Sequence, residues 1–256
     1  VAIPTLIGRV VASIVLIVAL KKKDNMVPFS LRGIFPLSFP IIGLIVSISI
    51  PGALENFLFH FSKVAITSMV SSFGTSSIAA YGSASNFWAM SSICSMALGR
   101  CFVTVIGRCM GSGDKEAAKY YSSYLLRISF VFSVLWNVLL LILTPIVLAG
   151  YALSPETKSL TMIIVFIHNF AFALLCAVHS ALPNGLRAAG DVKWVMWASL
   201  FSTVVCRVFF SWFFGIKLGW GVIGITLAMV VDWSIKAMLV YLRYHSGIWL
   251  EKKVIK

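Results

Sequence analysis

The sequence predicts an all-α fold, a polytopic helical bundle that lies in a membrane. Its mean hydropathy is +0.98, and 60% of its 256 residues are hydrophobic whereas only 11% are charged. Soluble domains carry about 25% charged residues, so a soluble globular domain is excluded. The apolar stretches are continuous, unlike the alternating strands of a membrane barrel. Helices are the remaining structures that satisfy their own backbone hydrogen bonds in lipid.

Seven apolar runs predict the membrane-spanning elements. They cover about 1–20, 36–72, 76–107, 121–149, 159–183, 192–214 and 220–243. A spanning helix needs about 20 residues, so each run except 36–72 fits one helix. That run is longer and contains Pro36, Pro40 and Pro51. It crosses the membrane either once, with a lead-in and a bend, or twice.

The basic residues between the runs decide between these alternatives. With one crossing, the loop bases that share one side are Lys21, Lys22, Lys23, Arg32, Arg108, Lys115, Lys119, Arg187, Lys193, Arg243, Lys252, Lys253 and Lys256. The opposite side holds Lys158 and Lys217, and with two crossings the bias disappears. Because cytoplasmic loops are rich in Lys and Arg, we predict one crossing, a multi-pass protein of the cell (inner or plasma) membrane and a cytoplasmic C-terminus.

The net charge of +13 is then explained by orientation signals in the loops. Membrane lipid is therefore the expected partner, and nucleic acid is not. The five cysteines show no paired spacing, so neither a disulfide framework nor a metal site is predicted. No nucleophile-and-base pattern or phosphate-binding loop is present, and we do not expect an enzyme or a resident cofactor. A membrane enzyme that uses His168 and His179 is the distant alternative.

Glu55 is the most informative residue, in the segment from Pro51 to Asn56. An acidic side chain at mid-membrane costs about 2.5–3.5 kcal/mol unless it is paired or protonated, so such residues usually serve ions or substrates. Pro51 would also free the Ser47 carbonyl, and a carboxylate beside a free carbonyl in a broken helix suits a cation or a proton. The structural alternative is a carboxylate that lies near the membrane interface or is paired with a buried base such as Arg100.

Other polar residues in the apolar runs are candidates for the same site. His168 and His179 are eleven positions apart, roughly on one helical face, where each could relay a proton. Asn86 and Trp88 could face a substrate cavity, Asn86 with an orienting amide and Trp88 with an aromatic face for an organic cation. For Trp88 and the histidines, packing is the alternative interpretation.

Asp232 and Lys236 stand four residues apart, the spacing that favours an ion pair along one helix. Thr5 and Arg9 repeat this spacing before a similar basic stretch. This repeated spacing indicates that Val1–Leu20 is the last helix of an earlier repeat and that a lobe is missing before it.

In its order of motifs, the chain resembles the C-terminal half of a multidrug and toxic compound extrusion (MATE) transporter from about Ile41 to Trp249. The motifs are Pro51–Asn56; Phe73-Gly74 with Ile78-Ala79-Ala80 and Asn86; Gly107 with Gly111–Ala117; Leu182–Arg187 with Gly190-Asp191; and Gly221–Gly224. The resemblance implies twelve helices in two similar lobes. Residues 1–20 would be the last helix of the missing N-terminal lobe, 21–40 a cytoplasmic connection, 41–249 the six-helix C-terminal lobe and 250–256 a cytoplasmic tail.

The resemblance also implies a function. Such a transporter exports small organic cations or drugs by alternating access in exchange for protons or sodium, and Glu55 matches the coupling carboxylate of the second lobe. Many relatives carry a second acidic residue in the tenth helix, where this sequence has none between Ser159 and Pro183 and offers His179. We therefore expect Glu55 and His179 to couple the ion, and Asn86 and Trp88 to line the substrate cavity. A related flippase for lipid-linked oligosaccharides is the nearest alternative.

Overall fold

The computed structural model describes residues 2–20 and 38–252, and it divides into two units, residues 1–47 and 48–256. The first unit contains helix α1 (Ala2–Leu20) and the start of α2 (Phe39–Ser71). The predicted connection 21–40 and tail 250–256 lie largely outside the described residues. Every element of the described chain is helical, as the sequence predicts.

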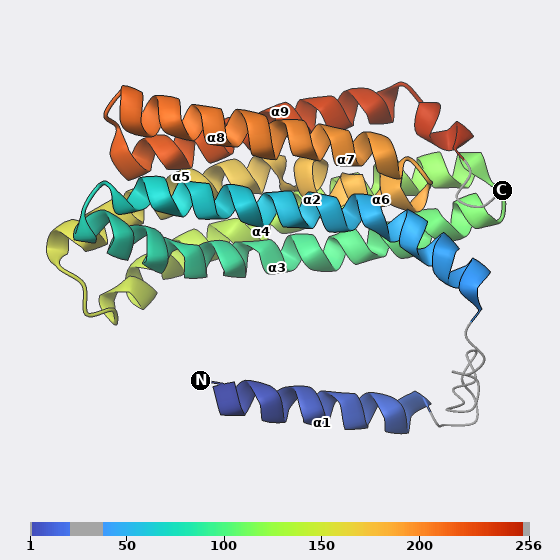
Figure 1. The fold of residues 1–256 in the computed structure, drawn as a ribbon, viewed down its shortest axis with the longest axis horizontal. Coiled ribbons are helices and arrows are strands. Elements are labelled where there is room, and N and C mark those ends of the chain that lie inside the picture. Colours follow the sequence, from blue (N-terminus) through green and yellow to red (C-terminus); the bar gives the residue numbers. More distant parts are fainter. Residues whose placement is uncertain (1, 21–37, 253–256) are drawn as a thin grey trace. The chain divides into compact units, whose positions relative to one another are not determined.

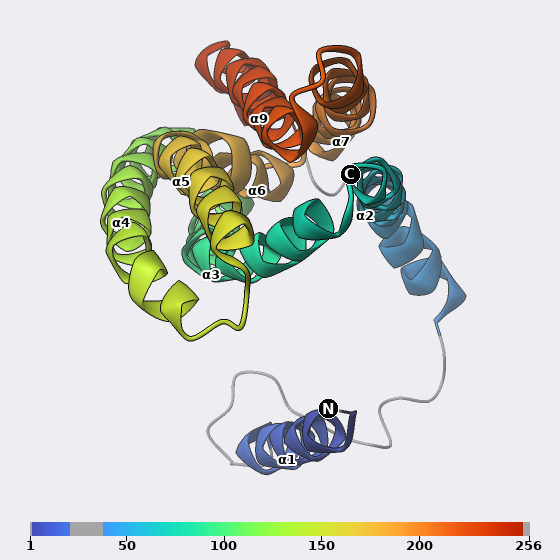
Figure 2. The ribbon, with the colours of Figure 1, turned by 90° about the vertical axis from the view of Figure 1, so that its left-hand side faces the viewer.

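The second unit is a bundle of long helices (Figure 1). After α2 they are α3 (Thr75–Gly111), α4 (Lys115–Ala149), α5 (Pro155–Cys176), η2 (Ala177–Ala181), α6 (Leu182–Ala188), α7 (Val192–Leu200), η3 (Phe201–Cys206), α8 (Arg207–Phe210), η4 (Ser211–Lys217), α9 (Gly221–His245) and η5 (Ile248–Glu251). The segments α5 to α6 form one continuous helix, and so do α7 to η4. Seen end-on, α3, α4 and α5 form one side of the bundle, α7 and α9 a second, and α2 a third (Figure 2).

Five helices of the described chain are long and apolar enough to cross a membrane. They are Thr75–Gly111, Lys115–Ala149, Pro155–Ala188, Val192–Lys217 and Gly221–His245. These bounds agree with the predicted apolar runs. Helix α2 adds 33 residues in one unbroken helix that contains Pro51. The described part of the run 36–72 therefore forms a single helix, Phe39–Ser71, that continues through Pro51, and the expectation of a broken helix at this proline is wrong.

The turns between helices follow from local sequence. Gly113 has a φ of 79°, a left-handed conformation that glycine adopts at little cost, and it ends α3. The Asp114 carboxylate then accepts a hydrogen bond from the Ala117 amide at 2.9 Å and caps α4. Ser154 caps α5 in the same way, through the Thr157 amide at 3.2 Å. These short connections return the chain to the bundle after each crossing.

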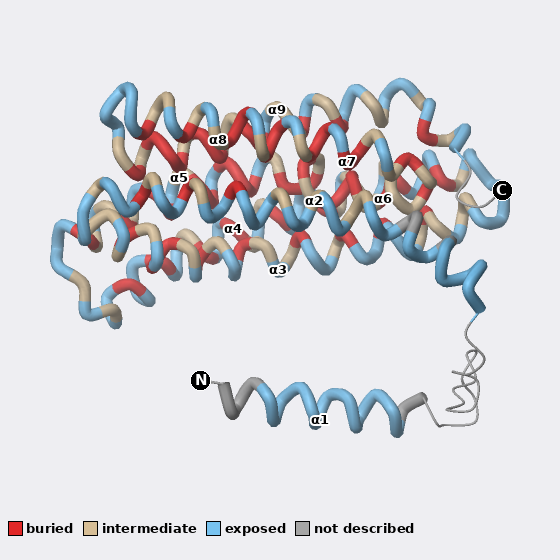
Figure 3. The backbone as a smooth tube through the Cα atoms, viewed as in Figure 1, coloured by how far each residue is buried: buried red, intermediate tan, exposed pale blue. Residues whose placement is uncertain are grey.

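Helix α4 shows how the burial pattern suits lipid. Its buried residues include Ser122, Ser129, Ser133, Asn137 and Thr144, whereas its large apolar side chains Phe132, Leu135, Ile142 and Ile146 are exposed. Figure 3 shows the exposed positions along the outer surfaces of the helices and the buried positions between them. Small and polar residues between helices with apolar residues outside are typical of membrane bundles.

Three apolar clusters hold the second unit together. One joins α2, α3, α4, α5 and α9 around Ala84, Phe87 and Ile225. Another joins α3, α4, η2, α6, α7, α9 and η5 around Phe102, Leu182 and Trp249. The third contains Phe172, Met229 and Trp233. This last cluster lies beside the cavity that carries the candidate site.

Candidate substrate cavity

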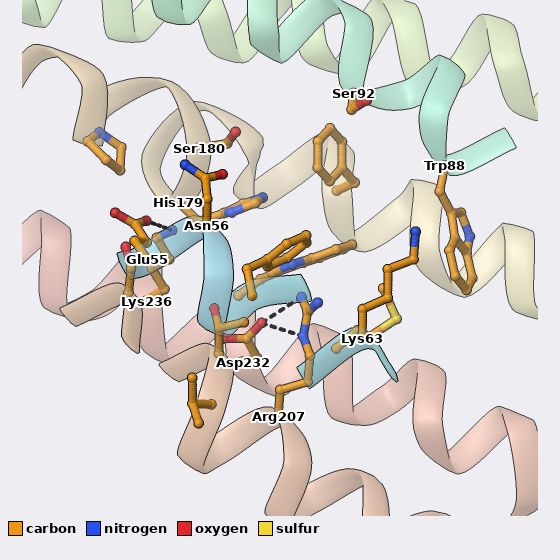
Figure 4. Close-up of a pocket in the computed structure, with 18 of the residues that line it drawn as sticks. Glu55, Asn56, Lys63, Trp88, Ser92, His179, Ser180, Arg207, Asp232 and Lys236 are labelled. Atoms are coloured by element: carbon orange, nitrogen blue, oxygen red, sulfur yellow. Dashed lines mark hydrogen bonds and ion pairs between the residues drawn. The ribbon is translucent and has the colours of Figure 1, made fainter. Parts of the chain in front are cut away.

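A cavity of about 620 Å³ lies within the second unit. Helices α2, α3, α5, α6, α9 and the segments η2 and η3 all contribute side chains to it (Figure 4). Its volume falls in the range of about 300–1,000 Å³ that is usual for small-molecule sites. The cavity is partly open, and most of its lining residues come from helices that can cross a membrane.

Glu55 faces this cavity from α2 and is paired. Nη2 of Arg187 donates to Glu55 Oε1 at 2.7 Å and to Oε2 at 2.6 Å. Nζ of Lys236 lies 4.0 Å from Oε1. Arg187 comes from the last turn of α6, so the partner suggested from the sequence, Arg100, is wrong. The Glu55 carboxylate thus sits between two bases from two different helices.

Asp232 forms the second ion pair, but not with Lys236. Arg207 donates from Nε to Asp232 Oδ2 at 2.8 Å, and its Nη2 lies 2.7 Å from the same oxygen. Both side chains are largely buried, with 10% of Arg207 and 1% of Asp232 exposed. The predicted pair between Asp232 and Lys236 is therefore wrong, because Lys236 turns toward Glu55 and the guanidinium of Arg207 takes its place.

The two histidines lie in an aromatic wall of the cavity. His168 stacks on Trp88 with ring centroids 4.8 Å apart and on Phe172 with centroids 5.6 Å apart. His179 stacks on Trp233 with centroids 5.2 Å apart, and Trp233 meets His168 edge-on at 4.8 Å. His179 belongs to η2, a π-helical turn, and such turns often occur at functional sites. The wall thus consists of two stacks of rings, and the planes of Trp233 and His168 meet at 82°.

Several buried polar atoms of the residues that line the cavity have no hydrogen-bond partner in the described chain. Within the cavity they are Nε1 of Trp88, Nε2 of His179, Oγ of Ser199 and Oδ1 of Asp232. Buried polar groups are normally satisfied. These atoms are unsatisfied although the side chains that carry them line the cavity.

The predicted site residues are only partly gathered here. Glu55, Trp88 and His179 line the cavity together with His168, whereas Asn86 is exposed on α3 and is not among the lining residues. In the described residues, no cluster of His, Cys, Asp and Glu has the geometry to hold a metal ion.

The sequence does not predict that four basic residues gather in this cavity. They are Lys63, Arg187, Arg207 and Lys236. The sequence places Arg187 in a loop because it stands near a Gly-Asp turn, whereas in the structure it belongs to the last turn of α6. Arg207 could have been found, because it stands fifteen residues into the run 192–214, too deep for easy snorkelling, and Asp232 lies at similar depth in the next run.

The described chain is thus an apolar helical bundle with five helices able to cross a membrane and a charged, aromatic cavity among them. The family model named MatE matches residues 51–213, more than half of the chain, and the chain belongs to this family of multidrug and toxic compound extrusion transporters. This membership replaces the alternative of a histidine enzyme, because these transporters are not enzymes.

Curated relatives agree with this assignment. The chain is 26% identical over 257 residues to YisQ, an uncharacterized transporter of Bacillus subtilis, covering 98% of the chain and 55% of the relative. It is 21% identical over 255 residues to NorM, a probable multidrug resistance protein of Thermotoga maritima, covering 99% of the chain and 54% of the relative. The chain spans about half the length of these relatives.

Solved structures share the fold. An outward-facing MATE transporter of the MOP superfamily superposes with a TM-score of 0.84 at 20% identity, over 97% of this chain and 56% of that one. A MOP superfamily transporter from Pyrococcus furiosus, described as having a binding pocket of reverse polarity, gives a TM-score of 0.72 at 21% identity, over 77% of this chain and 43% of that one. At these identities the likeness concerns the fold alone.

Proposed function

We propose that this chain forms one lobe of an ion-coupled antiporter that exports small organic compounds by alternating access. The observation that carries the proposal is the 620 Å³ cavity between membrane-spanning helices, with two ion pairs in its wall. Charged groups inside a membrane bundle are costly and usually serve transport. A second lobe, of which the chain would be the C-terminal partner, would close the cavity from the other side.

Glu55 is the proposed coupling residue. Its two oxygens are both occupied by the Arg187 guanidinium, so a sodium ion would have to displace a fixed cation at short range. A proton does not compete in this way, because protonation removes the carboxylate charge and releases Arg187 and Lys236 together. The ion pair therefore supports proton exchange over sodium exchange.

His179 is the proposed second coupling residue. It is buried, stacks on Trp233 and keeps Nε2 free of partners in the described chain. A neutral ring nitrogen of this kind can accept a proton that arrives through the cavity. Because both Glu55 and His179 line the same cavity, a proton on either residue would alter the charge that the substrate meets.

The substrate expected from the family resemblance is an organic cation. The aromatic wall around Trp88 and Trp233 supports such a ligand through cation–π attraction. The four basic side chains of the cavity, however, would repel an organic cation. The basic lining also favours the second candidate function, a flippase for a lipid-linked oligosaccharide, since the phosphate groups that link such lipids suit arginine and lysine.

The proposal places the protein in the cell membrane with its C-terminus in the cytoplasm. It is tested with the full gene product in proteoliposomes that carry an imposed proton or sodium gradient and a fluorescent dye. We expect dye exchange that depends on the proton gradient and is lost in Glu55→Gln. Accumulation of a lipid-linked saccharide in a deletion strain, without dye exchange in the vesicles, would favour the flippase and overturn the antiporter.

A further inference from the structure

The charge of the cavity differs from that expected for a site for organic cations. Four bases line it, Lys63, Arg187, Arg207 and Lys236, against the two carboxylates of Glu55 and Asp232. Counting the histidines as neutral, the cavity has an excess of two positive charges, four minus two. We infer that this cavity binds an organic anion with a flat apolar body, an inference that rests on the proposed transport function.

The excess charge can be assigned to the two lysines. Arg187 is held by Glu55, and Arg207 by Asp232, each at hydrogen-bonding distance. Lys236 lies 4.0 Å from Glu55, too far for a hydrogen bond. Lys63 is exposed in the cavity and forms no salt bridge with a carboxylate of the described chain. Both ammonium groups therefore have donors available for a ligand.

The surroundings increase the effect of this charge. The cavity lies among membrane-spanning helices, where the dielectric constant is low and charges interact strongly. An anion entering the cavity would balance the two positive charges that the carboxylates of Glu55 and Asp232 leave in excess. A cation would add a third positive charge to this excess and would be repelled.

The polar atoms without a hydrogen-bond partner also favour an anionic ligand. Nε1 of Trp88 is buried without a partner in the described chain, and an indole nitrogen can only donate. It needs an acceptor, such as the oxygen of a carboxylate, sulfonate or phosphate. Oδ1 of Asp232 needs a donor instead, but the charge of that carboxylate is already balanced by Arg207, so an uncharged donor such as a hydroxyl would suffice.

The body of the ligand is indicated by the aromatic wall. Trp88 and His168 stack in parallel, as do Trp233 and His179, and Phe59 presents its ring to the cavity from α2 between Glu55 and Lys63. Glu55 and Lys63 are eight residues apart, about 12 Å along the helix. The stacked aromatic rings together with the two lysines therefore favour a ligand that joins a flat ring system to an acidic group.

Two dyes with the same ring system test the inference. Fluorescein and rhodamine 6G share a xanthene core, but fluorescein is an anion and rhodamine 6G a cation. Binding is measured by fluorescence anisotropy on the purified full gene product, and exchange is measured in proteoliposomes. We expect fluorescein to bind at least about tenfold more tightly than rhodamine 6G, because a charge-assisted hydrogen bond contributes about that factor or more.

Three variants assign the effect to the cavity. Lys63→Gln and Lys236→Gln keep a polar side chain and remove the charge, and each should weaken fluorescein binding by about tenfold without weakening rhodamine 6G. The control is Lys193→Gln, since Lys193 is exposed on α7 and does not line the cavity. It should change neither dye. Thermal unfolding of each variant reports whether the fold is retained.

The outcomes separate this inference from the proposed function. Exchange of rhodamine 6G without fluorescein, or fluorescein binding unchanged in both lysine variants, overturns the anion site while transport stands. Fluorescein binding without exchange of either dye retains the anion site and overturns the antiporter. Failure of both dyes to bind overturns the anion site.

A lipid source for the anion is distinguished by competition. Geranyl phosphate carries the acidic group of a lipid phosphate, and geraniol is its uncharged counterpart. Displacement of fluorescein by geranyl phosphate but not by geraniol supports the anion site and assigns its ligand to lipid phosphates. Absence of displacement by geranyl phosphate, with fluorescein bound, supports a soluble aromatic anion instead.

Discussion

Arg187 donates from one guanidinium nitrogen to both carboxylate oxygens of Glu55, across 132 positions of the chain, at 2.7 and 2.6 Å. This pair joins α2 to α6 across the cavity. It connects the residue proposed to take up the coupling ion with a base that an anionic substrate would also attract. Opening the pair would therefore change both the shape and the charge of the site.

Glu55→Gln should abolish ion-driven exchange, because the amide keeps the shape of the side chain but cannot take up a proton at neutral pH. Arg187 then loses its partner, and since 28% of its side chain is exposed, we expect a loss of only about 1–3 kcal/mol in unfolding free energy. Melting temperature and dye flux are measured on the same preparation.

The double variant Glu55→Gln with Arg187→Gln separates the two roles of the pair. It removes both charges, so stability should recover relative to Glu55→Gln alone, as a double-mutant cycle reports. Flux should stay absent. Recovery of flux in the double variant would show that Glu55 is a structural partner of Arg187 and not a coupling residue.

Asp232→Asn should be more damaging to the fold than Glu55→Gln. The Arg207 guanidinium is nearly buried and has its short contacts with Asp232, so removal of that charge leaves a buried base unpaired, at a cost of about 3–5 kcal/mol. Denaturant unfolding of the purified protein measures the difference. The control is Arg207→Met combined with Asp232→Leu, which should regain most of the lost stability; a variant Asp232→Asn as stable as the parent protein would contradict the role of the pair.

The spans of this fold could be predicted from the sequence because hydrocarbon thickness requires about 20 apolar residues for each crossing. The run 192–214 thus anticipates the helix Val192–Lys217. The break at Pro51 could not be judged in this way, because a membrane helix can pass through a proline when neighbouring groups compensate for the lost hydrogen bond.

The partners of the charged residues could be predicted less well. Glu55 stands out because an acid at mid-membrane is costly, but nothing local to Glu55 indicates Arg187. Asp232 has Lys236 one turn away, yet a guanidinium from the neighbouring helix makes two short contacts with the same oxygen. Tertiary proximity decided this pair, and periodicity along one helix carries no information about it.

Gly224→Ala should destabilise the packing of α9 on η4. A Cβ atom at this position would lie 2.7 Å from the backbone carbon and oxygen of Phe214, and backbone atoms cannot move aside as a flexible side chain can. We expect a loss of about 1–3 kcal/mol. Gly82→Ala is the matched control, since its Cβ would meet nothing within 4 Å and alanine favours the helix. Equal melting temperatures for the two variants would contradict this close approach.

The last prediction concerns orientation in the membrane. In the structure, the turn after α3, the turn after α6 and the end of α9 gather at one end of the bundle, and the turns after α4 and η4 at the other (Figure 1). The basic loop residues predict that the first end is cytoplasmic. In a variant without the five native cysteines, single cysteines at Gly113 and Lys193 should react with an impermeant maleimide only after the membrane is opened. Cysteines at Lys158 and Lys217 should react in intact cells. Labelling of position 113 in intact cells would reverse the orientation and, with it, the side from which the proposed coupling proton reaches Glu55.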